Sequence, residues 1–149
     1  MSHEKALEEL VSITSNQELT LKKKIEALLL LGNKRFQTQC AIINKLNKNN
    51  IEPTLKFFSG DSKKHLTFDG LALKNKLSKL TLRKGAPLFF NDLPSLKKET
   101  TLLSSIHIKT YLSCPLKIQG GVYGVISFCS SDFREKPFSK KDIIFIKLF

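Results

Sequence analysis

The side chains best suited to covalent or metal chemistry are three cysteines and three histidines, and their spacing fits neither chemistry. Cysteine thiolates act as nucleophiles, redox pairs and zinc ligands. Cys40, Cys114 and Cys129 stand far apart within apolar stretches and form no C-x-x-C pair, so we expect three small core residues. The histidines are scattered along the chain, and we predict no metal site: they are His3, His65 and His107.

Motifs of the common enzyme classes are also missing. The chain contains no G-x-x-x-x-G-K-[ST], G-x-G-x-x-G, H-E-x-x-H or G-x-S-x-G. Gly120, Gly121 and Gly124 fit a tight turn and a closely packed strand better than a phosphate cradle. We therefore predict a protein without catalytic activity and without a cofactor.

Composition predicts one folded domain with a strong positive charge. The 149 residues are 41% hydrophobic and 26% charged, which suits a single globular core. The net charge of +12 raises the question of an anionic partner, but Arg35, Arg83 and Arg134 are the only arginines. Because phosphate-binding surfaces usually include arginine, we favour base-composition bias and expect no nucleic-acid partner. A lysine-rich surface that binds polyanions is kept as an alternative.

Targeting and membrane signals are not apparent. The longest apolar run, 27–31, is far shorter than the ~20 residues of a membrane span. Residues 1–5 do not resemble the start of a signal peptide. We expect a cytoplasmic protein with no membrane partner.

Hydrophobic spacing predicts an α+β order of elements. Helices are expected at 2–14, 20–36 and within 69–84, and a last helix begins at Ser139 with a capping box to Asp142. Strands are expected at 40–46, 54–58, 87–90, 110–119 and 122–129, and a polar connection with a short helix at 94–106. If Gly120-Gly121 forms the last turn, regular pairing puts Leu112, Cys114, Leu116, Tyr123, Val125 and Cys129 on one face. The other face then carries Tyr111, Ser113, Gly124, Ile126 and Phe128.

The C-terminal third resembles the end of a GAF domain. That family shows an x-V-P-L strand, a glycine turn, an x-G-x-L strand and an F-S-x-x-D helix start. Here the corresponding segments are YLSCPL at 111–116, GVYGVISF at 121–128 and PFSKKD at 137–142, with Cys114 in place of the usual aliphatic residue. The resemblance covers 19–149 as the domain proper, within a single domain whose leading helix and linker are 1–18.

This resemblance implies a GAF-like, PAS-like antiparallel sheet of five to six strands. Terminal helices would pack on one face, and loops and short helices would cover a small-molecule pocket on the other. Such domains are mostly cytoplasmic sensory or dimerisation modules of bacterial signalling proteins, beside an output module or partner protein. We expect a small-molecule sensor, a homodimer or both; a pure dimerisation or interaction module with a filled pocket is the alternative.

Specialised members of the family carry residues that this chain lacks. Bilin-binding and sulfoxide-reductase relatives use a cysteine in the middle of the domain, yet none occurs here between Asn44 and Ser113. The N-K-x-x-F-x-x-x-D-E pattern of cyclic-nucleotide-binding relatives is not completed after Asn33 or Asn44. We therefore expect neither a covalent chromophore nor reductase activity.

Candidate binding residues follow from position, although ordinary core, turn or loop roles are the alternative for each of them. For the ligand pocket they are Phe57, Phe89, Asp92, His107, Tyr111 and Ser113. The last helix is apolar around more than one face, which favours a homodimer through Leu7, Leu10, Phe145 and Phe149. Alternatively, the second helix covers this excess within one chain.

The charge gives a first testable prediction. DNA and RNA should bind weakly and without sequence preference through Lys63, Lys64, Lys74, Lys76, Lys79 and Lys84, and binding should vanish near physiological salt. A salt titration followed by fluorescence anisotropy measures this. Sequence-selective binding that survives physiological salt would favour the polyanion alternative over the sensor.

Overall fold

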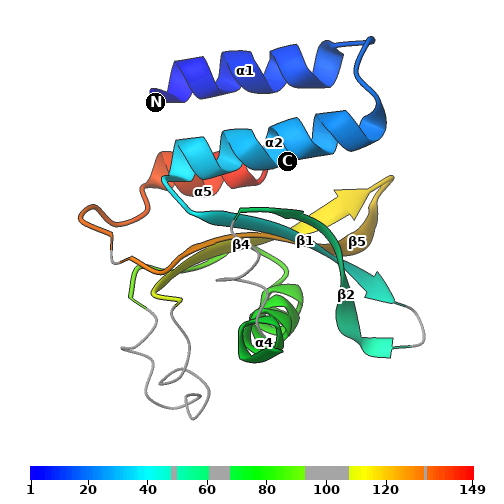
Figure 1. Ribbon diagram of the computed structural model, residues 1–149, viewed down its shortest axis with the longest axis vertical. Helices are drawn as coiled ribbons and strands as arrows, with labels where there is room; N and C mark the ends of the chain where they lie inside the picture. Colours follow the sequence, from blue (N-terminus) through cyan, green and yellow to red (C-terminus); the bar gives the residue numbers. More distant parts are fainter. Residues whose placement is uncertain (48–49, 61–67, 93–107, 133) are drawn as a thin grey trace.

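The computed structural model describes residues 1–47, 50–60, 68–92, 108–132 and 134–149. Helices cover both faces of one antiparallel sheet (Figure 1). The helices are α1 (His3–Ser15), α2 (Leu21–Phe36), α4 (Phe68–Lys84) and α5 (Lys140–Ile146). The strands are β1 (Cys40–Asn47), β2 (Asn50–Ser59), β3 (Leu88–Phe90), β4 (Thr110–Ile118) and β5 (Gly121–Ser130).

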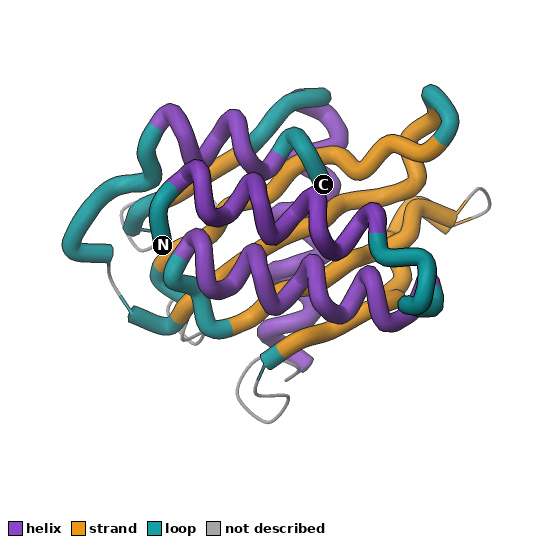
Figure 2. Tube along the Cα trace, turned by 90° about the horizontal axis from the view of Figure 1, so that it is seen from above, coloured by secondary structure: helices purple, strands orange, loops and turns teal. Residues whose placement is uncertain are grey.

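The sheet has five strands in the order β2-β1-β5-β4-β3, and every neighbouring pair is antiparallel. The two strands next to each other in the centre, β1 and β5, come from opposite ends of the domain. Seen from above, α1, α2 and α5 lie over the strands on one face (Figure 2). On the other face α4 packs against the sheet (Figure 1). The predicted α+β class, with terminal helices on one face, is confirmed.

Local signals in the sequence set the helix ends. Ser2, Thr20 and Ser139 are the N-cap residues of α1, α2 and α5, and each side chain accepts a backbone N–H hydrogen bond. The capping box between Ser139 and Asp142 is present as predicted. After α4, Gly85 adopts φ 65° and ends the helix. The predicted short helix at 94–106 lies outside the described residues.

Close packing of aromatic rings joins α2 and α5 to the sheet. Gly32 of α2 lies directly against Phe128 of β5, and an added Cβ would come within 2.2 Å of that ring. Phe36 meets Phe128 edge to face, with centroids 4.9 Å apart, and meets Phe145 of α5 at 5.9 Å. The rings of Phe36, Phe128 and Phe145 are fully buried. They form the centre of the larger hydrophobic core.

A buried ion pair also holds α2 to α5. The guanidinium of Arg35 lies 3.2 Å from the carboxylate of Asp142, and both side chains are largely buried. Asp142 also accepts the N–H of Ser139, while Arg35 donates to the carbonyl of Met1. Because each charge has additional polar partners, the pair ties α1, α2 and α5 together at one end.

The β4–β5 hairpin differs from the prediction in its turn. Gln119 and Gly120, with φ 52° and 80°, form the two-residue turn, one position earlier than expected. A bulge follows, because Leu116 pairs with Gly124 while Lys117 pairs with Val122. Tyr123 is therefore an extra residue. The register exchanges the faces predicted for Gly124, Val125, Ile126, Phe128 and Cys129, so that assignment is wrong.

Gly124 provides a stability test. An added Cβ there would lie 1.9 Å from the carbonyl oxygen of Asn44 in β1, so Gly124→Ala must push β1 and β5 apart. We expect the free energy of unfolding to fall by about 3 kcal/mol, measured by urea denaturation. Gly121→Ala is the matched control, since its Cβ would meet only the Ile118 carbonyl oxygen at 3.8 Å. Equal losses in the two variants would contradict this account.

Candidate functional site

The structure separates the residues predicted to line one ligand pocket. Tyr111 and Ser113 point to the α4 face of the sheet. Phe57 packs in the core beneath α2, and Phe89 lies against Phe138 just before α5, so both face the opposite side. Asp92 is exposed after β3. The sixth residue, His107, lies outside the described residues.

Tyr111 and Ser113 belong to a buried polar cluster between the sheet and α4. The hydroxyls of Ser113 and Thr81 lie 2.6 Å apart, and Thr81 also donates to the Leu77 carbonyl within α4. The amide of Asn44 in β1 donates to Ser78 of α4 at 3.2 Å. Asn44, Ser78, Thr81, Tyr111 and Ser113, which we call the hydroxyl cluster, are all buried. The cluster therefore places polar side chains from β1, β4 and α4 within an apolar layer.

The phenol of Tyr111 is the unusual member of the hydroxyl cluster. Its ring is 0% exposed, and its hydroxyl oxygen makes no hydrogen bond of standard geometry to the described residues, although the hydroxyls of Ser113, Thr81 and Ser78 lie close to it. Burial raises the pKa of Tyr111, and the nearby hydroxyls of Ser113, Thr81 and Ser78 offset part of that rise. A buried hydroxyl without a partner costs about 1–3 kcal/mol, so the cluster has an open position for a donor or acceptor.

Sequence reasoning missed three members of the hydroxyl cluster: Asn44, Ser78 and Thr81. A signal was present in α4, where Ser78 and Thr81 stand three residues apart beside the apolar Leu77 and Leu80. This spacing puts two hydroxyls on the helix face that meets the sheet. No comparable signal marks Asn44, because a polar residue within a strand usually points to solvent.

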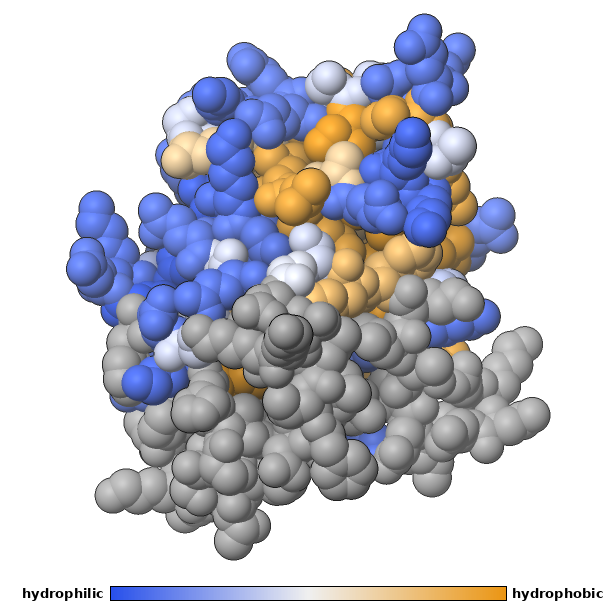
Figure 3. All heavy atoms as spheres, in the orientation of Figure 1, coloured by the Kyte–Doolittle hydropathy of each residue, from blue (hydrophilic) through white to orange (hydrophobic). Residues whose placement is uncertain are grey.

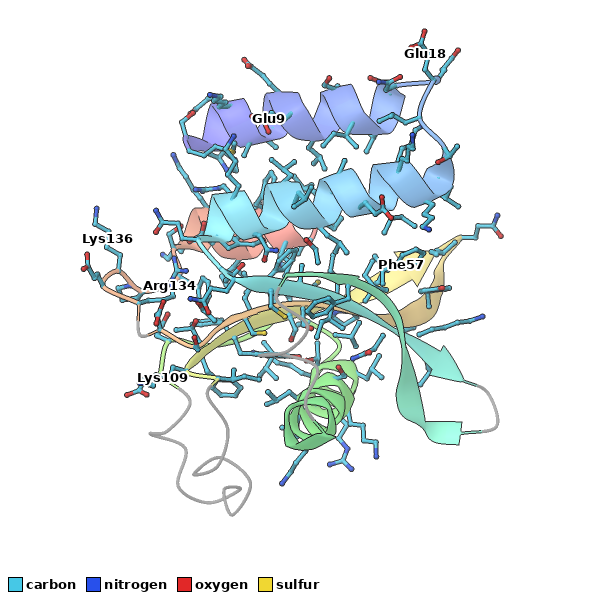
Figure 4. The ribbon with its side chains drawn as sticks, viewed as in Figure 1. Glu9, Glu18, Phe57, Lys109, Arg134 and Lys136 are labelled. Carbon is cyan, nitrogen blue, oxygen red and sulfur yellow. The ribbon has the colours of Figure 1, made fainter. Side chains whose placement is uncertain are left out.

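An apolar groove of about 390 Å³ lies on the opposite face of the sheet, beneath the N-terminal half of α2. Leu21, Ile25 and Leu28 form its α2 wall, and β1, β2 and the β4–β5 hairpin form its floor. Phe57 lines it, and Figure 4 shows this residue on the α2 side of the sheet. Orange, hydrophobic surface is visible on this side of the molecule (Figure 3). Phe57 thus belongs to a cavity, but not to the one that Tyr111 faces.

A polar cavity of about 460 Å³ lies beside the segment that precedes α5. Arg134 and Lys136, labelled in Figure 4, line it, together with Gln39 and Asp132. These groups bind one another or the backbone: Gln39 donates to Asp132 at 2.7 Å, and Arg134 donates to the carbonyls of Phe36 and Lys136. Burial lowers the pKa of Arg134. The residues around this cavity hold the segment before α5 in place. They carry charges of both signs and bind one another, so we do not propose a ligand site here.

All three cysteines are buried, as predicted. Cys40 and Cys129 face each other on β1 and β5, with sulfur atoms 3.3 Å apart. Burial raises the pKa of the Cys114 thiol, which keeps it protonated near neutral pH and unreactive as a nucleophile. Within the described ranges, no group of three His, Cys, Asp or Glu residues is arranged to hold a metal ion. Nor does any helix in this part of the chain have the length and apolarity to cross a membrane.

The four residues predicted for a dimer interface pack within the chain. Leu10 and Phe145 are buried in the core of α1, α2 and α5, and Leu7 and Phe149 are partly buried against it. Phe36 of α2 contacts Phe145 and Phe149, as the alternative stated above requires, and the homodimer stays a prediction. Ile144 and Leu148, by contrast, are about half exposed.

The comparisons with known proteins give a family and a fold. The model of the GAF domain family matches residues 30–149. No curated protein matches the chain significantly. Among solved structures, the GAF domain of an Acinetobacter phosphoenolpyruvate-protein phosphotransferase has a TM-score of 0.72 at 15% identity, covering 99% of this chain and 89% of that one.

Two further similar structures have different activities. Free methionine-R-sulfoxide reductase from Neisseria meningitidis, in complex with its substrate, has a TM-score of 0.67 at 12% identity, covering 96% of this chain and 80% of that one. GAF3 from Slr1393 of Synechocystis sp. PCC6803, in its photoproduct state, has a TM-score of 0.66 at 10% identity, covering 87% of each chain. At such identities the likeness shows the fold alone.

Tyr111→Phe tests the open position in the hydroxyl cluster. Removing a buried hydroxyl without a partner should raise the free energy of unfolding by about 1 kcal/mol at neutral pH, measured by urea denaturation. The pKa of folded Tyr111 is raised, so the stability held by its neutral form is complete below about pH 10 and is lost as pH rises further. Wild type should therefore lose more stability than Tyr111→Phe above that pH.

Tyr123→Phe is the control, because Tyr123 is the second of the two tyrosines and lies on the opposite face. Its free energy of unfolding should change little. A clear loss of stability in Tyr111→Phe would show that the hydroxyl has a partner after all.

Proposed function

This chain belongs to the GAF domain family, and on that basis we propose that it is a non-catalytic sensory module whose small-molecule ligand binds between the sheet and α4. The observation that carries the proposal is the buried Tyr111 hydroxyl, which makes no hydrogen bond of standard geometry within the described part of the chain. A ligand with a hydrogen-bonding group would complete the hydroxyl cluster and remove the cost of that unpaired group.

The mechanism is a shift between two arrangements of α4. Thr81 and Ser113 join α4 to β4, and Asn44 and Ser78 join it to β1. A ligand hydrogen-bonded to Tyr111 competes for these hydroxyls and changes how α4 sits on the sheet. Because the two arrangements bind the ligand with different affinity, the ligand favours one of them, and a partner that contacts α4 can detect the change.

Absence of catalysis is part of the proposal. Cys114 is buried and its pKa is raised, and Cys40 and Cys129 are buried opposite each other, so no thiol is placed to attack a substrate. The hydroxyl cluster contains hydroxyl and amide groups but no carboxylate or imidazole that could act as a general base. Such a set binds and orients a ligand without activating it.

The wider setting is also proposed from the family. We place the chain in the cytoplasm of a bacterial cell, within or beside a signalling protein whose output module detects the state of the domain. Association of two copies through the terminal helices would use side chains on their outer surface. Ile144 of α5 and Leu30 of α2 are exposed there, at 55% and 62%.

Native mass spectrometry of the purified 149-residue chain tests the proposal. We expect a bound small molecule that is released on denaturation, and Tyr111→Phe should lose it. Tyr123→Phe should retain it and also leaves Tyr111 as the only tyrosine in a chain without tryptophan, so tyrosine fluorescence then reports on the cluster alone.

Two results would contradict the proposal, one against ligand binding itself and one against its site between the sheet and α4. A chain that carries no small molecule and shows no change in Tyr111 fluorescence with bacterial metabolite extracts would favour the dimerisation module with a filled pocket. A ligand retained equally by Tyr111→Phe would place its site elsewhere in the domain.

A further inference from the structure

We propose that the apolar groove beneath α2 is a second binding site, which takes the hydrocarbon chain of an anionic amphiphile such as a long-chain fatty acid. The groove lies on the face of the sheet opposite the hydroxyl cluster. The inference is therefore independent of the proposed sensor function.

The shape of the groove follows from how α2 rests on the sheet. Gly32 brings the C-terminal half of α2 into direct contact with Phe128. Towards the other end of the helix, Ile25 and Leu28 are only partly buried and Leu21 is 75% exposed. The opening of about 390 Å³ beneath them falls within the usual size of small-molecule sites. Binding of a hydrocarbon in an exposed apolar cavity of this kind is favourable, because it removes apolar surface from water.

Polar groups in the groove limit the chemistry of its occupant. Of the twelve described residues that line it, only Tyr123 and Lys117 have polar side chains. A ligand with several polar groups would leave most of them buried without partners. A hydrocarbon with one anionic end matches both kinds of lining residue. Its tail contacts the aliphatic walls, and its head binds the Lys117 ammonium and the Tyr123 hydroxyl.

Charge around the groove favours the same occupant. Among the described residues that line the groove none is acidic, and a second cation, Lys45, lies over the Tyr123 ring at 5.6 Å from its centroid. The head of the amphiphile thus meets two lysines near Tyr123. A second copy of the chain is less suitable, because it would bring another net charge of +12 towards these lysines.

Displacement of a fluorescent fatty acid tests the site in the full chain. We expect cis-parinaric acid to bind with saturation and laurate to displace it. Ile118→Glu, which puts a carboxylate on the groove wall, should weaken binding by about tenfold or more. Val11→Glu is the control: Val11 is a similarly exposed apolar residue on α1 that is not among the described residues lining the groove, so binding should change by less than about twofold.

The head group is tested separately. Lys117→Gln should weaken the binding of laurate but not of its methyl ester, which has the same chain and no charge. Tyr111→Phe should leave laurate affinity unchanged, because it alters the opposite face; this separates the groove from the sensor site.

Three results would overturn the proposal. They are absence of saturable binding, equal effects of Ile118→Glu and Val11→Glu, and equal loss of laurate and methyl laurate binding in Lys117→Gln. A concentration-dependent dimer that Ile118→Glu abolishes in sedimentation velocity, and that laurate does not dissociate, would instead make the groove an interface between two copies.

Discussion

The contact between Gly32 and the Phe128 ring sets the distance between the helices and the sheet, and most of the structure depends on it. No side chain larger than hydrogen fits between α2 and β5 there. This approach lets Phe36 meet Phe128 edge to face and gives Phe145 and Phe149 a surface to pack on. It also explains the groove, since a helix pressed onto the sheet near its C-terminal end leaves space beneath its N-terminal end. Close packing and an unfilled cavity are thus two results of one contact.

Much of the fold could be predicted from the sequence, because local chemistry determines it. Ser2, Thr20 and Ser139 begin helices where their side chains can accept backbone N–H groups, and Gly85 ends one. The order of elements and the two covered faces of the sheet follow from patterns that span only a few residues. The C-terminal motifs indicate the family, because three motifs occur together in the order and at the spacing that GAF domains show.

The candidate site was less predictable, because it depends on contacts between distant segments. One extra residue, Tyr123, changes which face each later residue of β5 occupies, and the sequence carries no plain mark of such a bulge. Phe57 and Phe58 are equally apolar, yet only the strand register decides that Phe57 lies under α2 and Phe58 near α4. The partners of Ser113 and Asn44 lie on α4, more than thirty residues away along the chain. Such pairs become visible only in three dimensions.

The pairing of β1 with β5 in the centre of the sheet has a consequence for how the protein folds during synthesis. Cys40 and Cys129 face each other across a sequence separation of 89 residues. While the ribosome is still making the middle of the chain, α1, α2 and the first hairpin can form, but β1 has an unpaired edge. The sheet closes only when β5 emerges and pairs with β1. High contact order of this kind slows folding, and it leaves a nascent edge strand that must be protected from other chains until β5 has been made.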